Sequence, residues 1–163
     1  MNIQSRFLLL AILSLGAWSE VLLAESGETE RDGEAERDYE VNTAGVFVGM
    51  TGAGRRENGF TIALTYERRF SESFGLSFEA ERVYGDLDFW VVTVPLDFHY
   101  QSWKFFAGPG LEIADDAGNE WLMRVGGEYA FEAGRWEIAP TLAVDFVDSD
   151  TEIIGGLGFL YGF

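Results

Sequence analysis

The chain has 163 residues, a formal net charge of −17 at pH 7 and no cysteine. This length suits a single domain. The missing cysteines exclude a disulfide framework and thiolate chemistry, and the acidic balance argues against a nucleic-acid partner because phosphate binding needs clustered Lys and Arg.

Residues 1–24 have the order of a secretory signal peptide. Arg6 supplies the positive charge, and an apolar run from Phe7 to Trp18 is followed by small residues. Cleavage after Ser19 or after Ala24 fits this pattern. Glu20 interrupts the apolar run, which is also short for a membrane-spanning helix of about 20 residues. The sequence therefore predicts an exported protein.

Residues 25–42 are predicted to form a disordered acidic linker. The stretch ESGETERDGEAERDYE has eight acidic residues, two arginines and almost no apolar side chain. Such a composition buries too little surface to offset the entropy of ordering. A solvated spacer is the simpler interpretation, and a docking segment is the functional alternative.

Residues 43–163 alternate apolar and polar side chains with a period of two, which predicts strands. Turn residues divide this region into eight segments: about 43–50, 58–70, 74–85, 88–101, 103–113, 119–131, 135–147 and 152–163. Short links after every second segment predict an up-and-down sheet. Pro95 and Pro140 fall inside segments and are expected to mark bulges or lost ladder hydrogen bonds.

One face of these segments is bulky and apolar, and the other mixes small residues with charges. In the second segment, Phe60 and Leu64 share one side, whereas Thr61 and Glu67 share the other. A soluble lipocalin-like barrel would turn the apolar face inward, and a membrane barrel would turn it toward lipid.

Three features favour the membrane barrel. The apolar faces run for about 9–13 residues, the length that a tilted strand needs to cross a bilayer. Aromatic residues gather near the segment ends, as in the aromatic girdles of outer-membrane barrels. The small and charged face suits the crowded interior of a narrow barrel. We therefore predict an all-β fold, a closed antiparallel eight-stranded up-and-down transmembrane β-barrel over residues 43–163.

This region, about three quarters of the chain, resembles the small eight-stranded outer-membrane barrels, such as the OmpA barrel domain and the OmpX and OmpW types. The most specific element is the C-terminal stretch IIGGLGFLYGF, in which Phe163, Tyr161 and Gly158 match the family pattern. The family prefers a polar residue where this chain has Gly156.

The resemblance implies a fold and an insertion route rather than an activity. It implies that Gly158, Tyr161 and Phe163 form an insertion signal read by the barrel assembly machinery. The implied partners are this machinery, periplasmic chaperones, outer-membrane lipid and lipopolysaccharide. The implied location is the outer membrane of a Gram-negative bacterium, with the C-terminus in the periplasm.

The face that mixes small and charged residues carries most of the charged side chains that could have a function. We expect an interior polar network of Glu67, Arg69, Glu79, Glu81, Asp97, Lys104, Glu112, Arg124, Glu128, Glu137 and Asp145. Each base must be shared between carboxylates, because an unpaired buried charge is costly. A narrow cation path and a metal site are less favoured alternatives, since eight strands enclose little more than their own side chains.

Enzymatic chemistry is not expected. An outer-membrane lipid hydrolase needs a serine with a histidine base oriented by an acid, placed on the lipid face near the outer leaflet. The one histidine, His99, is predicted to face inward near the opposite end of its strand. We therefore expect no enzyme activity, no cofactor and no metal.

The predicted outer loops contain acidic and basic residues without a specific pattern. Asp86 and Asp116 belong to an acidic rim that lacks the spacing of a calcium site. Arg55, Arg56 and Arg82 could contact lipopolysaccharide phosphates. The sequence predicts a non-enzymatic outer-membrane barrel with a structural or interaction role. The alternative is a narrow cation-selective channel or a small-ligand transport barrel that uses the acidic interior.

Overall fold

The computed structural model describes residues 39–54, 57–114, 118–148 and 150–163. The predicted signal peptide and residues 25–38 of the predicted linker lie outside these ranges, as do Arg55, Arg56 and Asp116. Among the described residues, no helix is long and apolar enough to cross a membrane.

The regular structure of these residues is all β. The strands are β1 (Asn42–Ala53), β2 (Glu57–Arg69), β3 (Phe74–Gly85), β4 (Phe89–Thr93), β5 (Leu96–Tyr100), β6 (Trp103–Ala114), β7 (Gly118–Tyr129), β8 (Phe131–Ala133), β9 (Trp136–Val147) and β10 (Asp150–Gly162).

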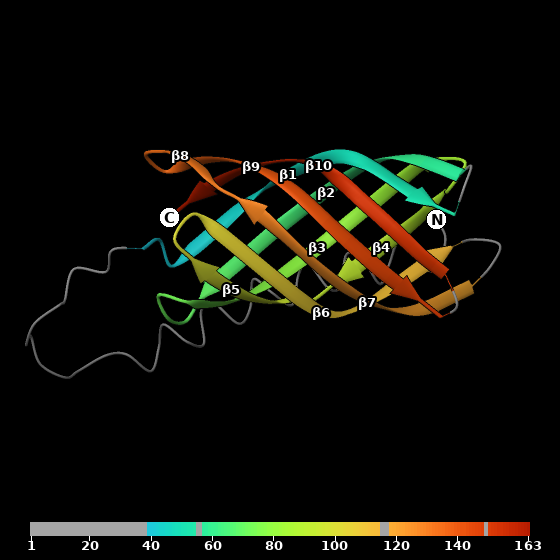
Figure 1. Cartoon of the computed structure of the whole chain (residues 1–163), viewed down its shortest axis with the longest axis horizontal. Helices are drawn as coiled ribbons and strands as arrows, with labels where there is room; N and C mark the ends of the chain where they lie inside the picture. The colour runs from blue at the N-terminus through green and yellow to red at the C-terminus, as the bar shows by residue number, and fades with distance from the viewer. Residues whose placement is uncertain (1–38, 55–56, 115–117, 149) are drawn as a thin grey trace, which may run out of the picture. The chain divides into compact units, whose positions relative to one another are not determined.

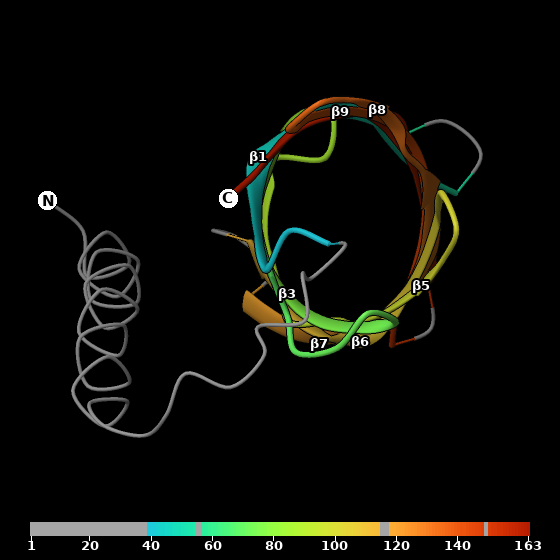
Figure 2. The ribbon, with the colours of Figure 1, turned by 90° about the vertical axis from the view of Figure 1, so that its left-hand side faces the viewer.

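These segments form a closed antiparallel barrel of eight strands (Figures 1 and 2). β4 and β5 both pair with β3 and β6, so they are two halves of one barrel strand. β7 and β8 are likewise both paired with β9. β10 pairs with β1 and closes the ring. The predicted all-β, eight-stranded closed barrel is therefore confirmed.

The break between β4 and β5 falls at Val94 and Pro95. The Pro95 carbonyl accepts a hydrogen bond from the Ser77 amide at 2.9 Å, but Pro95 has no amide hydrogen to return one. The predicted disturbance at Pro95 is thus confirmed. At Pro140, β9 stays paired with Leu157 of β10, but its ladder on the other side stops at Thr141 and resumes at Ile138. The predicted disturbance at Pro140 is therefore found on the β7–β8 side of β9.

The register sets the tilt of the strands. A path of paired residues that starts at Asn42 returns to β1 at Gly52, ten residues further along; it passes through Arg68, Leu76, Leu96, Ala107, Val125, Val144 and Ile153. With a strand spacing of about 4.8 Å and a rise of about 3.4 Å per residue, a shear of ten over eight strands gives a tilt of about 40°. Figure 1 shows this steep tilt.

The two ends of the barrel differ in their connections. We call the end that holds Asn42 and Phe163 the terminus end; the backbones of these two residues exchange hydrogen bonds of 3.0 and 2.8 Å. The turns β2–β3, β5–β6 and β8–β9 lie there. We call the opposite end, with the links β1–β2, β3–β4, β6–β7 and β9–β10, the far end.

The apolar face of the strands points outward. Leu64 is 61% exposed and Trp121 is 75% exposed, whereas Thr61 and Asp145 on the opposite face are fully buried. This is the reverse of a soluble barrel and matches the predicted membrane barrel. Aromatic rings also contact one another around the outer surface of the terminus end, as in the Trp103–Tyr129 and Trp136–Tyr161 pairs, whose centroids are 5.0 Å apart.

Inward-facing glycines allow neighbouring backbones to approach closely. A Cβ on Gly156 would lie 2.3 Å from the Val48 carbonyl oxygen and 2.6 Å from the Phe47 ring. A Cβ on Gly158, two residues later, would make ordinary contacts of 3.5 Å or more. A glycine is therefore required at Gly156, because the backbone of β1 and the ring of Phe47 leave no room for a side chain there.

Candidate functional site

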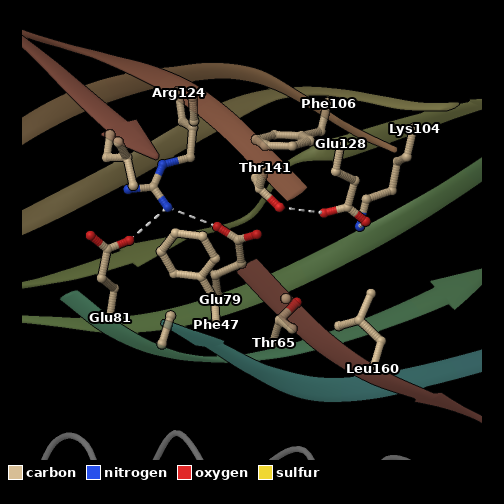
Figure 3. Close-up of a pocket in the computed structure, with 14 residues that line it drawn as sticks. Phe47, Thr65, Glu79, Glu81, Lys104, Phe106, Arg124, Glu128, Thr141 and Leu160 are labelled. Carbon is tan, nitrogen blue, oxygen red and sulfur yellow. Dashed lines mark hydrogen bonds and ion pairs between the residues drawn. The ribbon is translucent and has the colours of Figure 1, made fainter. Parts of the chain in front are cut away.

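The candidate site is the polar interior, which contains two ionic clusters at different depths. The Arg124 cluster consists of Arg124, Glu79, Glu81 and Asp145 and lies toward the far end. The Lys104 cluster consists of Lys104, Glu67, Glu128, His99 and Arg69 and lies toward the terminus end. Figure 3 shows Arg124 and Lys104 on opposite sides of one cavity.

Arg124 holds three carboxylates at once. Its Nε and Nη2 donate to the two oxygens of Asp145 at 2.8 and 2.7 Å. Its Nη1 lies 2.8 Å from Glu79 and 2.9 Å from Glu81 (Figure 3). The residue is 3% exposed. The planar guanidinium can bind in this fork-like way because its donors have a fixed geometry, and it thereby joins β3, β7 and β9.

The Lys104 cluster is centred on the carboxylate of Glu67. Glu67 lies 2.6 Å from His99 Nε2, 3.4 Å from Lys104 Nζ and 3.5 Å from Arg69 Nε. Lys104 also contacts Glu128 at 2.8 Å, and Arg69 contacts the ring of His99. The bonds of the His99 ring thus go to Glu67 and Arg69, as expected of an interior histidine held by polar neighbours.

Two apolar layers confine the Arg124 cluster. The first, toward the terminus end, is an aromatic belt built from Phe47, Phe106, Ala143 and Ile154. The second is a far-end plug, which consists of Val83, Leu87, Phe89, Val91, Leu122 and Val147. Both layers place apolar side chains inside the barrel and interrupt the polar lumen.

Two cavities inside the barrel are small. A cavity of about 30 Å³ lies between the two clusters and is lined by both Arg124 and Lys104 (Figure 3). A second cavity, of about 20 Å³, lies at the terminus end beside His99 and Ser102. Since a water molecule needs about 10–15 Å³ of such space, the first cavity has room for two or three waters and the second for one or two.

The structure brings together eight of the eleven residues predicted for the network. The other three are Asp97, Glu112 and Glu137. Asp97 is buried and accepts a hydrogen bond from Ser77 at 2.6 Å. Glu112 lies opposite Glu120 in the register, and Glu137 lies opposite Glu132. The geometry places all eleven on inward-facing positions, and their action as one functional unit stays a prediction.

Sequence reasoning missed one interior carboxylate and the plug. Glu152 is 6% exposed and faces the lumen near the start of β10. The signal in the sequence was that Glu152 is two and four residues from Ile154 and Gly156, so it lies on the same face of the predicted strand as they do, at the strand's first position. The plug was harder to predict. Val83, Phe89 and Val91 are apolar residues at inward-facing positions of their strands, where most other residues are small or polar, so each one by itself looks like an isolated exception to the pattern.

The residues predicted for an insertion signal lie on both faces of β10. Gly158 faces inward, whereas Tyr161 and Phe163 face outward with their rings stacked at a centroid distance of 6.4 Å. Their role in insertion stays a prediction. Within the described ranges, no group of three or more acidic, histidine or cysteine side chains could hold a metal ion.

Comparisons with known proteins show the fold and no close relative. No family model matches the chain, and no curated protein matches its sequence. The N-terminal β-barrel domain of Pseudomonas aeruginosa OprF is similar, with a TM-score of 0.57 and 11% identity, over 77% of this chain and 100% of that domain.

Two further solved structures are similar. A de novo designed transmembrane β-barrel matches with a TM-score of 0.54 and 12% identity, over 78% of this chain and 99% of that one. Ail, the attachment invasion locus protein of Yersinia pestis, matches with a TM-score of 0.50 and 12% identity, over 76% and 99% of the two chains. At these identities the likeness is one of fold.

Proposed function

We propose that this protein is a non-enzymatic outer-membrane β-barrel with a structural or interaction role at the surface of a Gram-negative bacterium. The observation that carries the proposal is the contrast between the two faces of the sheet. The outer face is a continuous apolar surface bounded by aromatic residues, and the lumen is filled by ion pairs and apolar layers. An apolar outer surface and a filled lumen suit a barrel that is embedded in lipid and has no open pore.

The filled lumen favours a structural role over the channel alternative. A cation would have to pass the far-end plug, the Arg124 cluster and the aromatic belt in turn. The cavities of about 30 and 20 Å³ have room for only about two or three and one or two waters, respectively. These small spaces support a structural role over a path for hydrated ions through the acidic interior.

We further propose that the terminus end faces the periplasm. This end carries the tight turns and the outward-facing Tyr161 and Phe163, which suit recognition by the assembly machinery and by periplasmic chaperones. The far end would then meet lipopolysaccharide. Arg82 faces outward there, but its guanidinium lies between the rings of Tyr84 and Trp90 and contacts Asp88. Any phosphate contact would have to compete with Asp88.

Two measurements on the purified full chain test this proposal. On an SDS gel, the unheated protein is expected to migrate differently from the boiled protein, since a closed barrel resists SDS. In a planar lipid bilayer, the same sample is expected to give no steady current. A steady cation current that disappears in the Glu79→Gln/Glu81→Gln double variant would establish the channel instead. A protein that stays soluble without detergent would contradict the membrane barrel itself.

A further inference from the structure

Glu152 is a buried residue whose carboxylate lacks a hydrogen bond to one of its oxygens among the described residues. It is the third residue of β10, faces the lumen at the far end and is 6% exposed. In the described part of the chain, its Oε2 atom is buried and has no hydrogen-bond partner. An ionised carboxylate in this position would lose hydration without a compensating bond, which is costly.

The surroundings of Glu152 make a negative charge still less favourable. Asp145 lies directly opposite on β9, facing the same side of the sheet, and like charges at directly opposed positions repel. The charged groups around Glu152 come from four strands: Glu81 (β3), Glu112 (β6), Arg124 (β7) and Asp145 (β9). Glu112 in turn lies opposite Glu120 in the register.

Arg124 is the one cation among these groups, and four of its five N–H donors already have carboxylate partners. Both oxygens of Asp145 are bonded to it, and Glu79 and Glu81 occupy its remaining nitrogen. The Oε1 atom of Glu81 is itself buried without a partner among the described residues. The far-end half of the lumen therefore holds more carboxylates than its guanidinium can neutralise.

A proton fits this position better than a metal ion. A metal ion needs several converging ligands, and no group of three such side chains is found in the part of the chain that the structure describes. A proton needs no cavity and removes one charge outright. We propose that Glu152 is a proton-binding site, which is neutral in the closed barrel and takes up its proton as the barrel folds.

The position of Glu152 connects this proton to the plug. Glu152 lies opposite Ala53 on β1, and Ala53 packs against the plug. Ionisation of Glu152 would draw water to the edge of this apolar layer. Closure of the far end is therefore linked to proton uptake. The inference uses the barrel geometry and does not depend on the physiological role of the protein.

The first test is the pH dependence of unfolding by urea, measured on the full chain in lipid vesicles between about pH 5 and pH 9. If the folded barrel holds one more proton than the unfolded chain, stability falls as pH rises. The unfolding equilibrium constant then increases by up to tenfold per pH unit for this proton. Glu152→Gln should remove this part of the slope. Glu132→Gln, an exposed acid at the terminus end, is the matched control and should keep it.

The second test uses infrared spectroscopy of the folded barrel at neutral pH, where a protonated carboxyl has a carbonyl band distinct from that of a carboxylate. The spectra are compared in an Asp97→Asn background, because the Oδ1 atom of Asp97 is also buried without a hydrogen-bond partner among the described residues. In this background the band should be present in the parent chain and in Glu81→Gln, and absent in Glu152→Gln. If Glu152→Gln does not fold, the spectra of the parent and of Glu81→Gln still decide. A parent spectrum without the band, loss of the band in Glu81→Gln, or an unchanged pH slope in folded Glu152→Gln would overturn the proposal.

Discussion

The Arg124 cluster and the Lys104 cluster both neutralise buried carboxylates inside a narrow barrel, but with different numbers of basic side chains. In the Arg124 cluster, one guanidinium with fixed donors contacts three acids between two apolar layers. In the Lys104 cluster, one acid, Glu67, is shared by three basic side chains next to the terminus-end opening.

This difference shows how the charge balance depends on depth. The Arg124 cluster has more acids than bases and has no second base to replace Arg124. The Lys104 cluster has spare bases, because Arg69 and His99 contact Glu67 as well. Loss of the central base should therefore be far more damaging in the first cluster than in the second, since it would leave several buried carboxylates unpaired.

The largest effect is expected for Arg124→Met, which removes the base and keeps a side chain of similar length. Three carboxylates lose their partner, and two of them, Glu81 and Asp145, are buried, so the free energy of unfolding should fall by about 3–5 kcal/mol. Urea unfolding in lipid vesicles measures this change. Arg68→Met, at an exposed position on the outer face near the terminus end, is the control and should shift the unfolding free energy by less than about 0.5 kcal/mol.

A smaller effect is expected for Lys104→Met. Glu128 loses its ion pair, but Glu67 keeps His99 and Arg69, so the cost should be about 2–3 kcal/mol. The same urea titration compares the two variants directly. A cost equal to or larger than that of Arg124→Met would contradict the contrast between the clusters and would mean that depth and donor geometry do not set the cost of losing the base.

The smallest effect is expected at the belt that separates the clusters. Gly156→Ala would bring a methyl group to 2.3 Å from the Val48 carbonyl and 2.6 Å from the Phe47 ring, and should cost about 1–3 kcal/mol as an overpacked site does. Gly158→Ala is a matched control in the same strand, with contacts of 3.5 Å or more, and should leave the urea midpoint nearly unchanged. Equal effects of the two alanines would show that backbone approach at Gly156 is not critical.

Much of the barrel could be predicted from residue parity. Along β2, bulky apolar residues such as Phe60 and Leu64 alternate with small or charged residues such as Thr61 and Glu67. This alternation predicted both the strand and the face that points outward. Period-two alternation is a local property, so a single strand carries it without reference to its neighbours. The positions of the turns followed from the same pattern, within a few residues.

The contents of the lumen could not be predicted in the same way. The parity of Arg124 shows that it faces inward, but only the register places Asp145 beside it and Glu79 and Glu81 across from it. The plug needs Val83, Leu122 and Val147 from three strands to meet at one height. Such contacts depend on the shear of the barrel, which no individual strand encodes.

The sequence by itself determined that this protein exposes a bulky apolar face, turns small and charged residues away from it and ends on an aromatic strand. Those features are set by side-chain size and polarity along one chain. Closure of the ring decided the contacts inside it: which acids share Arg124, why Oε2 of Glu152 has no hydrogen-bond partner among the described residues, and where apolar layers narrow the lumen. The physical reason is that a tilt of about 40° brings together residues far apart in sequence, at a depth where each unpaired charge matters.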